Sequence, residues 1–268
     1  MPLSGPEIIL YEKKDHIVTI TLNRPERMNA TTPETFGRLD DAWQKFQQDD
    51  DAFVAIWTAT GDKAFCAGND LKEQAARVAE DPDFDIVKLV PGVILGTAGT
   101  PYGNNVTKPV VGAINGIATA GGFEFSMMCD LKVAAYHASF GVGEVKVGRG
   151  TPWAIPVLWQ MPLPMAFEVL LMGNPVPAQR LYDVGWINRV VPMEQLMPTA
   201  IEMASILATN APLSVRAAKE VLYNAMDVGR KTGLDMAKLV YEKVYASEDA
   251  IEGPLAFSEK RKPIWKGR

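Results

Sequence analysis

The sequence predicts an α/β fold built from parallel strands that are joined by crossover helices. A strand-like run, a turn and an amphipathic helical stretch follow one another at residues 54–79 and again at 110–128. After Met193 the pattern is helical almost without a break. Parallel strands need a long crossover connection, usually a helix, so this alternation favours a parallel sheet followed by a helical region.

The composition is that of an ordinary globular enzyme. The 268 residues are 47% hydrophobic and 22% charged, and the net charge of −5 argues against nucleic acid or an anionic membrane as a partner. Cys66 and Cys129 sit among apolar or small residues, as buried thiols do, and no residues have the spacing of metal ligands. We see neither an export signal nor an apolar run of about 18 residues, and therefore expect a cytoplasmic protein.

The first 80 residues predict a hairpin, a helix, a buried strand and a second helix. Residues 8–11 and 17–22 have the pattern of two hairpin strands. Thr32 followed by Pro33 is typical of a helix start, and apolar residues at helical spacing continue that helix to residue 47. Residues 54–59 indicate a buried strand, and residues 70–79 an amphipathic helix.

Glycine and proline interrupt residues 80–107 repeatedly, which makes this segment the least regular part of the chain. A loop of this length within a compact enzyme is usually functional or disordered. We therefore consider two interpretations, a wall or lid of a pocket and a solvated excursion.

The C-terminal part predicts long amphipathic helices at residues 196–208, 214–226 and 234–245. A last helix begins at Ser247, a good N-cap residue that is followed by two acids. We place a change of domain near Pro198. Residues 1–197 then form the core with the active site, and residues 198–268 form a helical region for oligomerisation.

Two glutamates, Glu124 and Glu144, are the strongest chemical signal. Each follows small or glycine residues that allow a tight turn, and a third turn at residues 64–71 follows the strand at 54–59. Strand-to-helix turns with free backbone N–H groups can hold an anionic oxygen. Two carboxylates beside that oxygen can move protons at the α-carbon of a carbonyl compound. The pattern therefore indicates a site that stabilises an enolate.

These residues also resemble a known family, the crotonase (enoyl-CoA hydratase/isomerase) superfamily. The resemblance covers nearly the whole chain, and the joint order of its motifs is far more specific than any one of them. The matching motifs are LNRPERMNA (22–30), AFCAGNDL (64–71), PVVGAING (109–116), AGGFE (120–124), CD (129–130), SFGVGE (139–144), AQRLYDVG (178–185) and NAP (210–212).

The resemblance implies a spiral of repeated ββα units with a C-terminal helical region that builds homotrimers, paired as homohexamers. It implies an acyl-CoA thioester substrate whose oxygen lies between the backbone N–H groups of Asn69 and Gly121. In such a site Glu144 delivers the proton to Cα, and Glu124 activates and orients the water. No metal and no separate cofactor is implied, since coenzyme A is part of the substrate.

Further residues are implied to bind the CoA or the acyl group. In the family, the region of Phe257 and Lys260, an i, i+3 pair on one expected helix face, often reaches the CoA of a neighbouring subunit. The residues assigned to substrate binding by the resemblance are Arg27, Ala67, Gly68, Asp70, Leu71, Gly122, Trp153, Phe257 and Lys260.

The sequence departs from the family at two places that bear on the acyl group, the turn with Trp153 and Ile155, which stand where glycines usually line an open pocket, and the irregular segment 80–107. Ala120 also replaces a common glycine, which is a mild change. We expect an enoyl-CoA hydratase of fatty acid or aromatic acid metabolism. The alternatives are an enoyl-CoA isomerase, a hydratase-lyase acting on an aryl or branched enoyl-CoA, and a non-catalytic homologue that binds acyl-CoA or RNA. The presence of both glutamates favours the hydratase.

Overall fold

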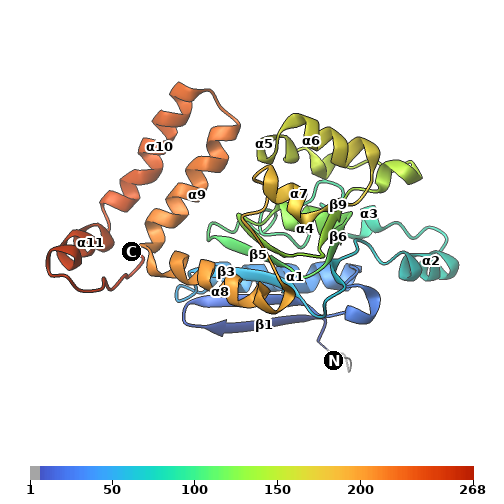
Figure 1. Ribbon diagram of the computed structural model, residues 1–268, viewed down its shortest axis with the longest axis horizontal. Helices are drawn as coiled ribbons and strands as arrows, with labels where there is room; N and C mark the ends of the chain where they lie inside the picture. The colour runs from blue at the N-terminus through green and yellow to red at the C-terminus, as the bar shows by residue number, and fades with distance from the viewer. Residues whose placement is uncertain (1–6) are drawn as a thin grey trace.

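The computed structural model describes residues 7–268, which form two β-sheets flanked by helices (Figure 1). The larger sheet has the strand order β1-β2-β3-β5-β7-β10, and the smaller sheet has the order β4-β6-β8-β9. The larger sheet contains β1 (Ile9–Lys14), β2 (Ile17–Leu22), β3 (Val54–Ala59), β5 (Val110–Ile114), β7 (Leu131–Ala135) and β10 (Arg189–Val191). The smaller sheet contains β4 (Ala64–Cys66), β6 (Ile117–Thr119), β8 (Ser139–Gly141) and β9 (Val176–Pro177).

Strand pairing confirms the predicted α/β fold. β1 and β2 pair antiparallel, with Ile9 opposite Leu22, and form the predicted hairpin. The other neighbours in the larger sheet run parallel. In the smaller sheet β4, β6 and β8 are parallel, and β9 closes the edge antiparallel to β8.

Each of three consecutive units contributes one strand to each sheet and then enters a helix. β3 and β4 lead into α2 (Leu71–Glu80), β5 and β6 into α4 (Gly121–Met127), and β7 and β8 into the short helix η2 (Glu144–Val147). This repeat is the predicted spiral of ββα units. Because β4, β6 and β8 are adjacent and parallel, the turns that follow them lie at one edge of the smaller sheet.

Helix α1 (Pro33–Gln48) fills the space beside the larger sheet. It begins as predicted, since the Thr32 hydroxyl accepts from the Thr35 N–H at 3.2 Å and Pro33 occupies the first turn. The apolar residues expected at helical spacing are buried, among them Trp43, whose ring meets that of Trp57 edge-on at 5.0 Å between centroids. The Trp43 Nε1 donates to the carbonyl of Gly99 at 3.0 Å, so α1 also anchors the irregular segment.

Helix α8 (Met193–Thr209) belongs to the packing of the larger sheet. Its buried side chains Leu196, Ala200 and Ala204 pack against Val54 and other residues of β3, β5 and β7. Pro198 lies inside this helix, so the predicted division between residues 197 and 198 falls within an element of the core. In Figure 1 the helices that stand away from the sheets begin after α8, with α9 (Pro212–Met226) and α10 (Arg230–Tyr245).

Shorter helices complete the described chain. They are η1 (Pro25–Arg27), α3 (Ile86–Leu89), η3 (Pro152–Ala154), α5 (Val157–Gln160), α6 (Leu163–Phe167), the π-helical turn η4 (Glu168–Met172), α7 (Ala178–Asp183) and α11 (Glu248–Ser258). No helix of residues 7–268 is long and apolar enough to cross a membrane.

We predict that Trp43→Ala lowers the free energy of unfolding by about 3–5 kcal/mol, the usual cost of deleting a buried aromatic side chain. The variant also leaves the buried Gly99 carbonyl without its donor. Urea unfolding followed by circular dichroism measures the change. Asp41→Ala, on the exposed face of the same helix, should change the value by less than about 0.5 kcal/mol. Equal values for the two variants would contradict this account of the core.

Candidate active site

Glu124 lies in the first turn of α4, the helix that follows strand β6. Only 6% of the residue is exposed, and no hydrogen bond from another described residue stabilises its carboxylate. Burial, and after it the negative charge of Glu144, raises the pKa of Glu124 to about 8. The effect of Glu144 on this pKa means that the structure brings the two predicted carboxyl groups within electrostatic reach of each other.

Glu144 is the first residue of η2, three positions after β8 ends. Its Oε2 atom is buried and has no hydrogen-bond partner among the described residues. Burial raises the pKa of Glu144, and its own backbone N–H opposes that shift more weakly. A buried carboxyl oxygen without a partner is costly unless water or a ligand completes its hydrogen bonds. Glu144 therefore has a buried carboxyl oxygen that is left for water or a ligand to complete.

The turns after β4 and β6 face each other through glycines. A Cβ atom at Gly121 would lie 3.5 Å from Cα of Gly68, and a Cβ atom at Gly68 would lie 3.3 Å from the backbone nitrogen of Gly121. Thr31 holds the first turn, because its N–H donates to the Gly68 carbonyl at 2.8 Å and its hydroxyl donates to the Asn69 side chain at 2.9 Å.

The backbone N–H groups of Asn69 and Gly121 remain free. Neither donates to a backbone acceptor within residues 7–268. Gly121 opens α4, so its N–H also belongs to the positive end of a helix. Two free N–H groups on facing turns can bind one carbonyl oxygen and stabilise negative charge on it.

Gly122 serves the packing of α4 rather than leaving space for a ligand. A Cβ atom there would lie 1.9 Å from the carbonyl oxygen of Cys66 at the end of β4. Only glycine allows α4 to come this close to the strand. Ala120, which stands where the family commonly has glycine, takes a positive φ of 53° at the start of this turn. This backbone conformation is unfavourable for alanine, whereas glycine adopts it without strain.

The irregular segment 80–107 packs onto the site. A Cβ atom at Gly96 would lie 3.2 Å from Oε1 of Glu124 and 2.9 Å from Cβ of Trp153. Gly96, Ala98, Gly99 and Thr100 are all buried. The segment is therefore a wall over Glu124, which supports the first of its two interpretations. Sequence reasoning did not single out Gly96, because glycines occur throughout the segment and nothing local distinguishes this one.

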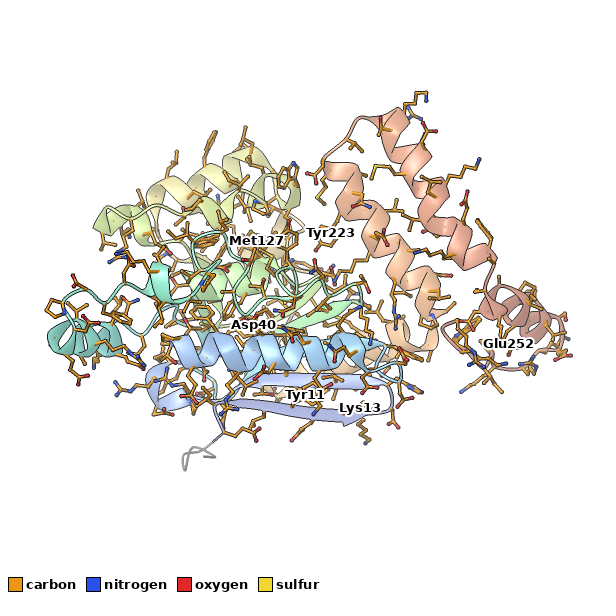
Figure 2. The ribbon with its side chains drawn as sticks, turned by 180° about the vertical axis from the view of Figure 1, so that it is seen from behind. Tyr11, Lys13, Asp40, Met127, Tyr223 and Glu252 are labelled. Atoms are coloured by element: carbon orange, nitrogen blue, oxygen red, sulfur yellow. The ribbon has the colours of Figure 1, made fainter. Side chains whose placement is uncertain are left out.

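Helix α1 holds this wall in place. Oδ1 of Asp40 accepts from the Gly99 N–H at 2.9 Å and from the Asn104 side chain at 2.6 Å. Trp43 binds the carbonyl of the same Gly99, so one helix fixes both backbone groups of that residue. Figure 2 labels Asp40 on α1. Asp40 is thus a second residue that sequence reasoning missed, since its partner lies 59 positions along the chain.

Trp153 lies at the site as predicted, whereas Ile155 does not. Trp153 is buried, and its ring centroid is 6.5 Å from that of Phe123, the neighbour of Glu124. The side chain of Ile155 is exposed. Of the two bulky residues that replace family glycines, only the tryptophan forms part of the wall.

Some of the residues assigned to CoA binding already make contacts within the chain, whereas others are exposed. Asp70 caps α2 through the Glu73 N–H at 3.1 Å and forms an ion pair with Arg24 at 3.1 Å, so its carboxylate is already engaged. Arg24 is a further residue that sequence reasoning missed. Ala67 donates its N–H to the Met28 carbonyl at 3.1 Å. Arg27 and Leu71 are exposed beside this turn and remain available to a ligand.

Phe257 and Lys260 lie far from the glutamates of their own chain. Figure 1 places α11 at the opposite end of the molecule from α2, with α4 between them. The two residues do not share one helix face as predicted. α11 ends at Ser258, and Lys260 lies beyond its end with a φ of 54°.

Comparison with known proteins identifies relatives over nearly the whole chain. The family model described as enoyl-CoA hydratase/isomerase matches residues 12–268. A protein of Citrobacter koseri named carnitinyl-CoA dehydratase is 37% identical over 270 residues, which cover 98% of this chain and 99% of the relative. A protein of the same name from Escherichia coli K12 is 38% identical, with the same coverage.

Solved structures of enoyl-CoA hydratases also superpose on this chain over nearly its whole length. A crystal structure of an enoyl-CoA hydratase from Bacillus anthracis superposes with a TM-score of 0.89 at 33% identity and covers 98% of this chain and 100% of that one. An enoyl-CoA hydratase from Mycobacterium tuberculosis superposes with a TM-score of 0.86 at 32% identity, covering 97% of this chain and 99% of that one.

We predict that Glu124 makes the protein less stable as the pH rises. Its folded pKa of about 8 exceeds the ordinary value of 4.5, so the folded chain keeps a proton that the unfolded chain releases between these values. The free energy of unfolding therefore falls as the pH rises through that window. Glu124→Gln should remove much of this pH-dependent loss in the free energy of unfolding. Melting temperatures of both proteins from about pH 5 to about pH 9 test it. If the melting temperatures of the wild type and the variant changed with pH in the same way, the raised pKa of Glu124 would be contradicted.

Proposed function

The chain belongs to the enoyl-CoA hydratase/isomerase family, the crotonase superfamily, and we propose that it is an enoyl-CoA hydratase that adds water reversibly to a 2-enoyl-CoA thioester. The relatives support a hydro-lyase of this family. The observation that carries the finer proposal is the pair Glu124 and Glu144. The charge of Glu144 raises the pKa of Glu124, and Oε2 of Glu144 is buried without a hydrogen-bond partner in the part of the chain that the structure describes. A water molecule between the two groups would complete their hydrogen bonds and be held for reaction.

We place the thioester oxygen between the N–H groups of Asn69 and Gly121. When the water oxygen bonds to Cβ, the electrons of the double bond move toward Cα and the carbonyl, which creates an enolate. The two N–H groups stabilise that charge, and losing one such donor costs about 3 kcal/mol in comparable sites. Gly121 lets the thioester approach its backbone closely, because it has no side chain.

Two proton transfers complete the addition. A carboxylate accepts a proton from the attacking water, and a carboxyl group delivers a proton to Cα, so that one water molecule is added in total. Following the family, we assign the water to Glu124 and the Cα proton to Glu144. The proposed chemistry needs only these groups, water and the CoA thioester, so we propose no separate cofactor.

Carnitinyl-CoA is a second candidate substrate. Two relatives at 37% and 38% identity bear the name carnitinyl-CoA dehydratase, and dehydration of a 3-hydroxyacyl thioester is the reverse of the proposed reaction. The acyl part of carnitinyl-CoA carries a trimethylammonium group. Trp153 offers a buried aromatic ring beside Gly96 at the site, and aromatic rings attract such cations. Turnover of straight-chain, branched, aryl and trimethylammonium enoyl-CoAs, measured side by side, separates this candidate from the others.

Association of chains would place Phe257 near a second active site. Phe257 is 87% exposed on α11, and α10 also exposes the large apolar side chains Leu234, Leu239 and Tyr245. A second apolar surface lies on α5, α6 and η4, where Trp159, Leu163, Phe167 and Leu171 are exposed. Exposed apolar area on this scale marks an interface. We propose homotrimers, paired as homohexamers, in which α11 of one chain lies beside the CoA of another.

We predict that Glu124→Gln and Glu144→Gln each lower the hydration rate by at least about a hundredfold, the scale on which a positioned acid or base contributes. The change removes the ionisable group and keeps the shape of the side chain. Stopped assays on the best substrate of the panel measure it, with circular dichroism as a check of folding. Near wild-type rates in both variants would show that the hydratase assignment is wrong.

We predict that Gly121→Val abolishes turnover of every thioester, because the side chain enters the gap between the two turns. The fold should tolerate the change, since a Cβ atom there meets only Cα of Gly68 at 3.5 Å. Gly229→Ala, where a Cβ atom meets nothing within 4 Å, is the matched control and should keep full activity. A folded Gly121→Val protein with normal turnover would overturn the placement of the oxygen.

We predict a solution mass of three or six times the 29.3 kDa chain, measured by light scattering at micromolar concentration. Phe257→Ala should raise the KM for the CoA substrate if α11 reaches a neighbouring site. A stable monomer with full activity would contradict both the assembly and the shared site.

A further inference from the structure

A pocket of about 390 Å³ lies between α9 and the sheet, outside the site described above. β7, α9 and the residues around Trp186 line it, and neither Glu124 nor Glu144 takes part. Figure 2 labels Tyr223, one of its lining residues, on the side of α9 that faces the core. The volume is at the small end of the range for metabolite-binding pockets.

Lys132 is the unusual residue in this pocket. It stands on β7 with only 5% of its surface exposed, and its Nζ lies 4.8 Å from the centroid of the Trp186 ring. Within residues 7–268 its ammonium group has no hydrogen bond and no ion pair, and Lys132 is one of the residues that line the pocket. Burial lowers the pKa of Lys132, while the nearby Cys129 and Asp130 oppose that shift.

Two other lysines nearby are satisfied by the chain itself. Lys108 donates to the carbonyls of Phe46 and Asp49 at 2.7 and 2.6 Å. Lys219 pairs with Asp130 at 2.9 Å and donates to the Lys108 carbonyl at 2.9 Å. An unpaired buried ammonium costs several kcal/mol. Lys132 therefore differs from these two lysines in having donors that no described residue accepts, which leaves them to water or to a bound molecule.

The side chains of Asp130, Tyr223 and Gln160, which also line the pocket, are already engaged. Oδ2 of Asp130 accepts from the Val110 N–H at 2.7 Å and from Lys219, and Oδ1 accepts from the Tyr223 hydroxyl at 3.1 Å. Gln160 accepts from the Trp186 Nε1 at 3.0 Å and donates to the Met127 carbonyl at 3.0 Å. The Asp130 carboxylate thus has its hydrogen bonds elsewhere, which leaves the positive charge of Lys132 to select the ligand.

We propose that this pocket binds a carboxylate with a short apolar tail, with Lys132 as its counter-charge. The carboxylate accepts hydrogen bonds from Nζ in place of the missing partner. The tail packs against the apolar side chains of the lining, and the binding is separate from the thioester site. The apolar lining residues are Leu131, Trp186, Leu207, Val215, Leu222 and Met226.

Isothermal titration of the full-length protein with octanoate tests the proposal. We expect binding to the wild type and a loss of at least about tenfold in Lys132→Met, which keeps the length of the side chain and removes its charge. Lys132→Arg should retain binding. Lys238→Met, at an exposed lysine of α10, is the control and should bind as the wild type does. Octanol, which has the tail without the charge, should bind at least about tenfold more weakly than octanoate.

A second pair of variants tests the pocket without changing Lys132, in case the Lys132 variants do not fold. Leu222 lines the pocket from α9 and is largely exposed, so the fold should accept a charge there. Leu222→Glu should weaken octanoate binding by repulsion, and Leu222→Lys should not. Absence of octanoate binding to the wild type, equal binding by Lys132→Met, or equally tight binding of octanol or of inorganic phosphate would each overturn the proposal.

Discussion

The parallel pairing of β4, β6 and β8 is the constraint on which the rest of the site depends. Cys66 pairs with Ala118, and Thr119 pairs with Gly141, so the three strands end together. The turns that follow carry the free N–H of Asn69, the free N–H of Gly121 and the carboxyl of Glu144. Gly122 then lets α4 lie directly against β4, which fixes the direction of Glu124. The groups of the proposed active site are far apart in the sequence, and the register of adjacent strands brings the turns that carry them to one edge of the sheet.

Burial, and after it the negative charge of Glu144, raises the pKa of Glu124 to about 8, so Glu124 holds a proton at neutral pH. The roles taken from the family require the opposite arrangement, with Glu124 ionised to accept a proton from water. A water molecule between the carboxyls offers a path for the proton to pass to Glu144 once substrate is bound. The protonation of Glu124 therefore depends on what is bound beside it as well as on its burial.

The parts of the fold that the sequence predicted correctly are those whose signals are local. The hairpin, the capped start of α1 and the strand β3 follow from residues within a few positions of each other. The approach of Gly96 to Glu124 was not predictable in this way, since it depends on Asp40 of α1 holding Gly99. The predicted division near Pro198 falls inside α8, because the exposed face of that helix accommodates the proline while neighbouring residues pack on the sheet. Lys260 was misplaced because the end of α11 depends on a backbone reversal that spacing does not reveal.

Trp186 connects the proposed carboxylate pocket to the helix that carries Glu124. Its ring stacks on Phe123 at 5.2 Å between centroids with an interplanar angle of 7°, and Phe123 is the residue before Glu124. The same ring faces Nζ of Lys132, and its Nε1 binds Gln160, which in turn binds the carbonyl of Met127 at the end of α4. Contacts of this kind form a continuous physical route between the two sites. Coupling of binding is reciprocal, so a carboxylate that changes the affinity of the glutamate site for its substrate has its own affinity changed by the same factor when that substrate binds.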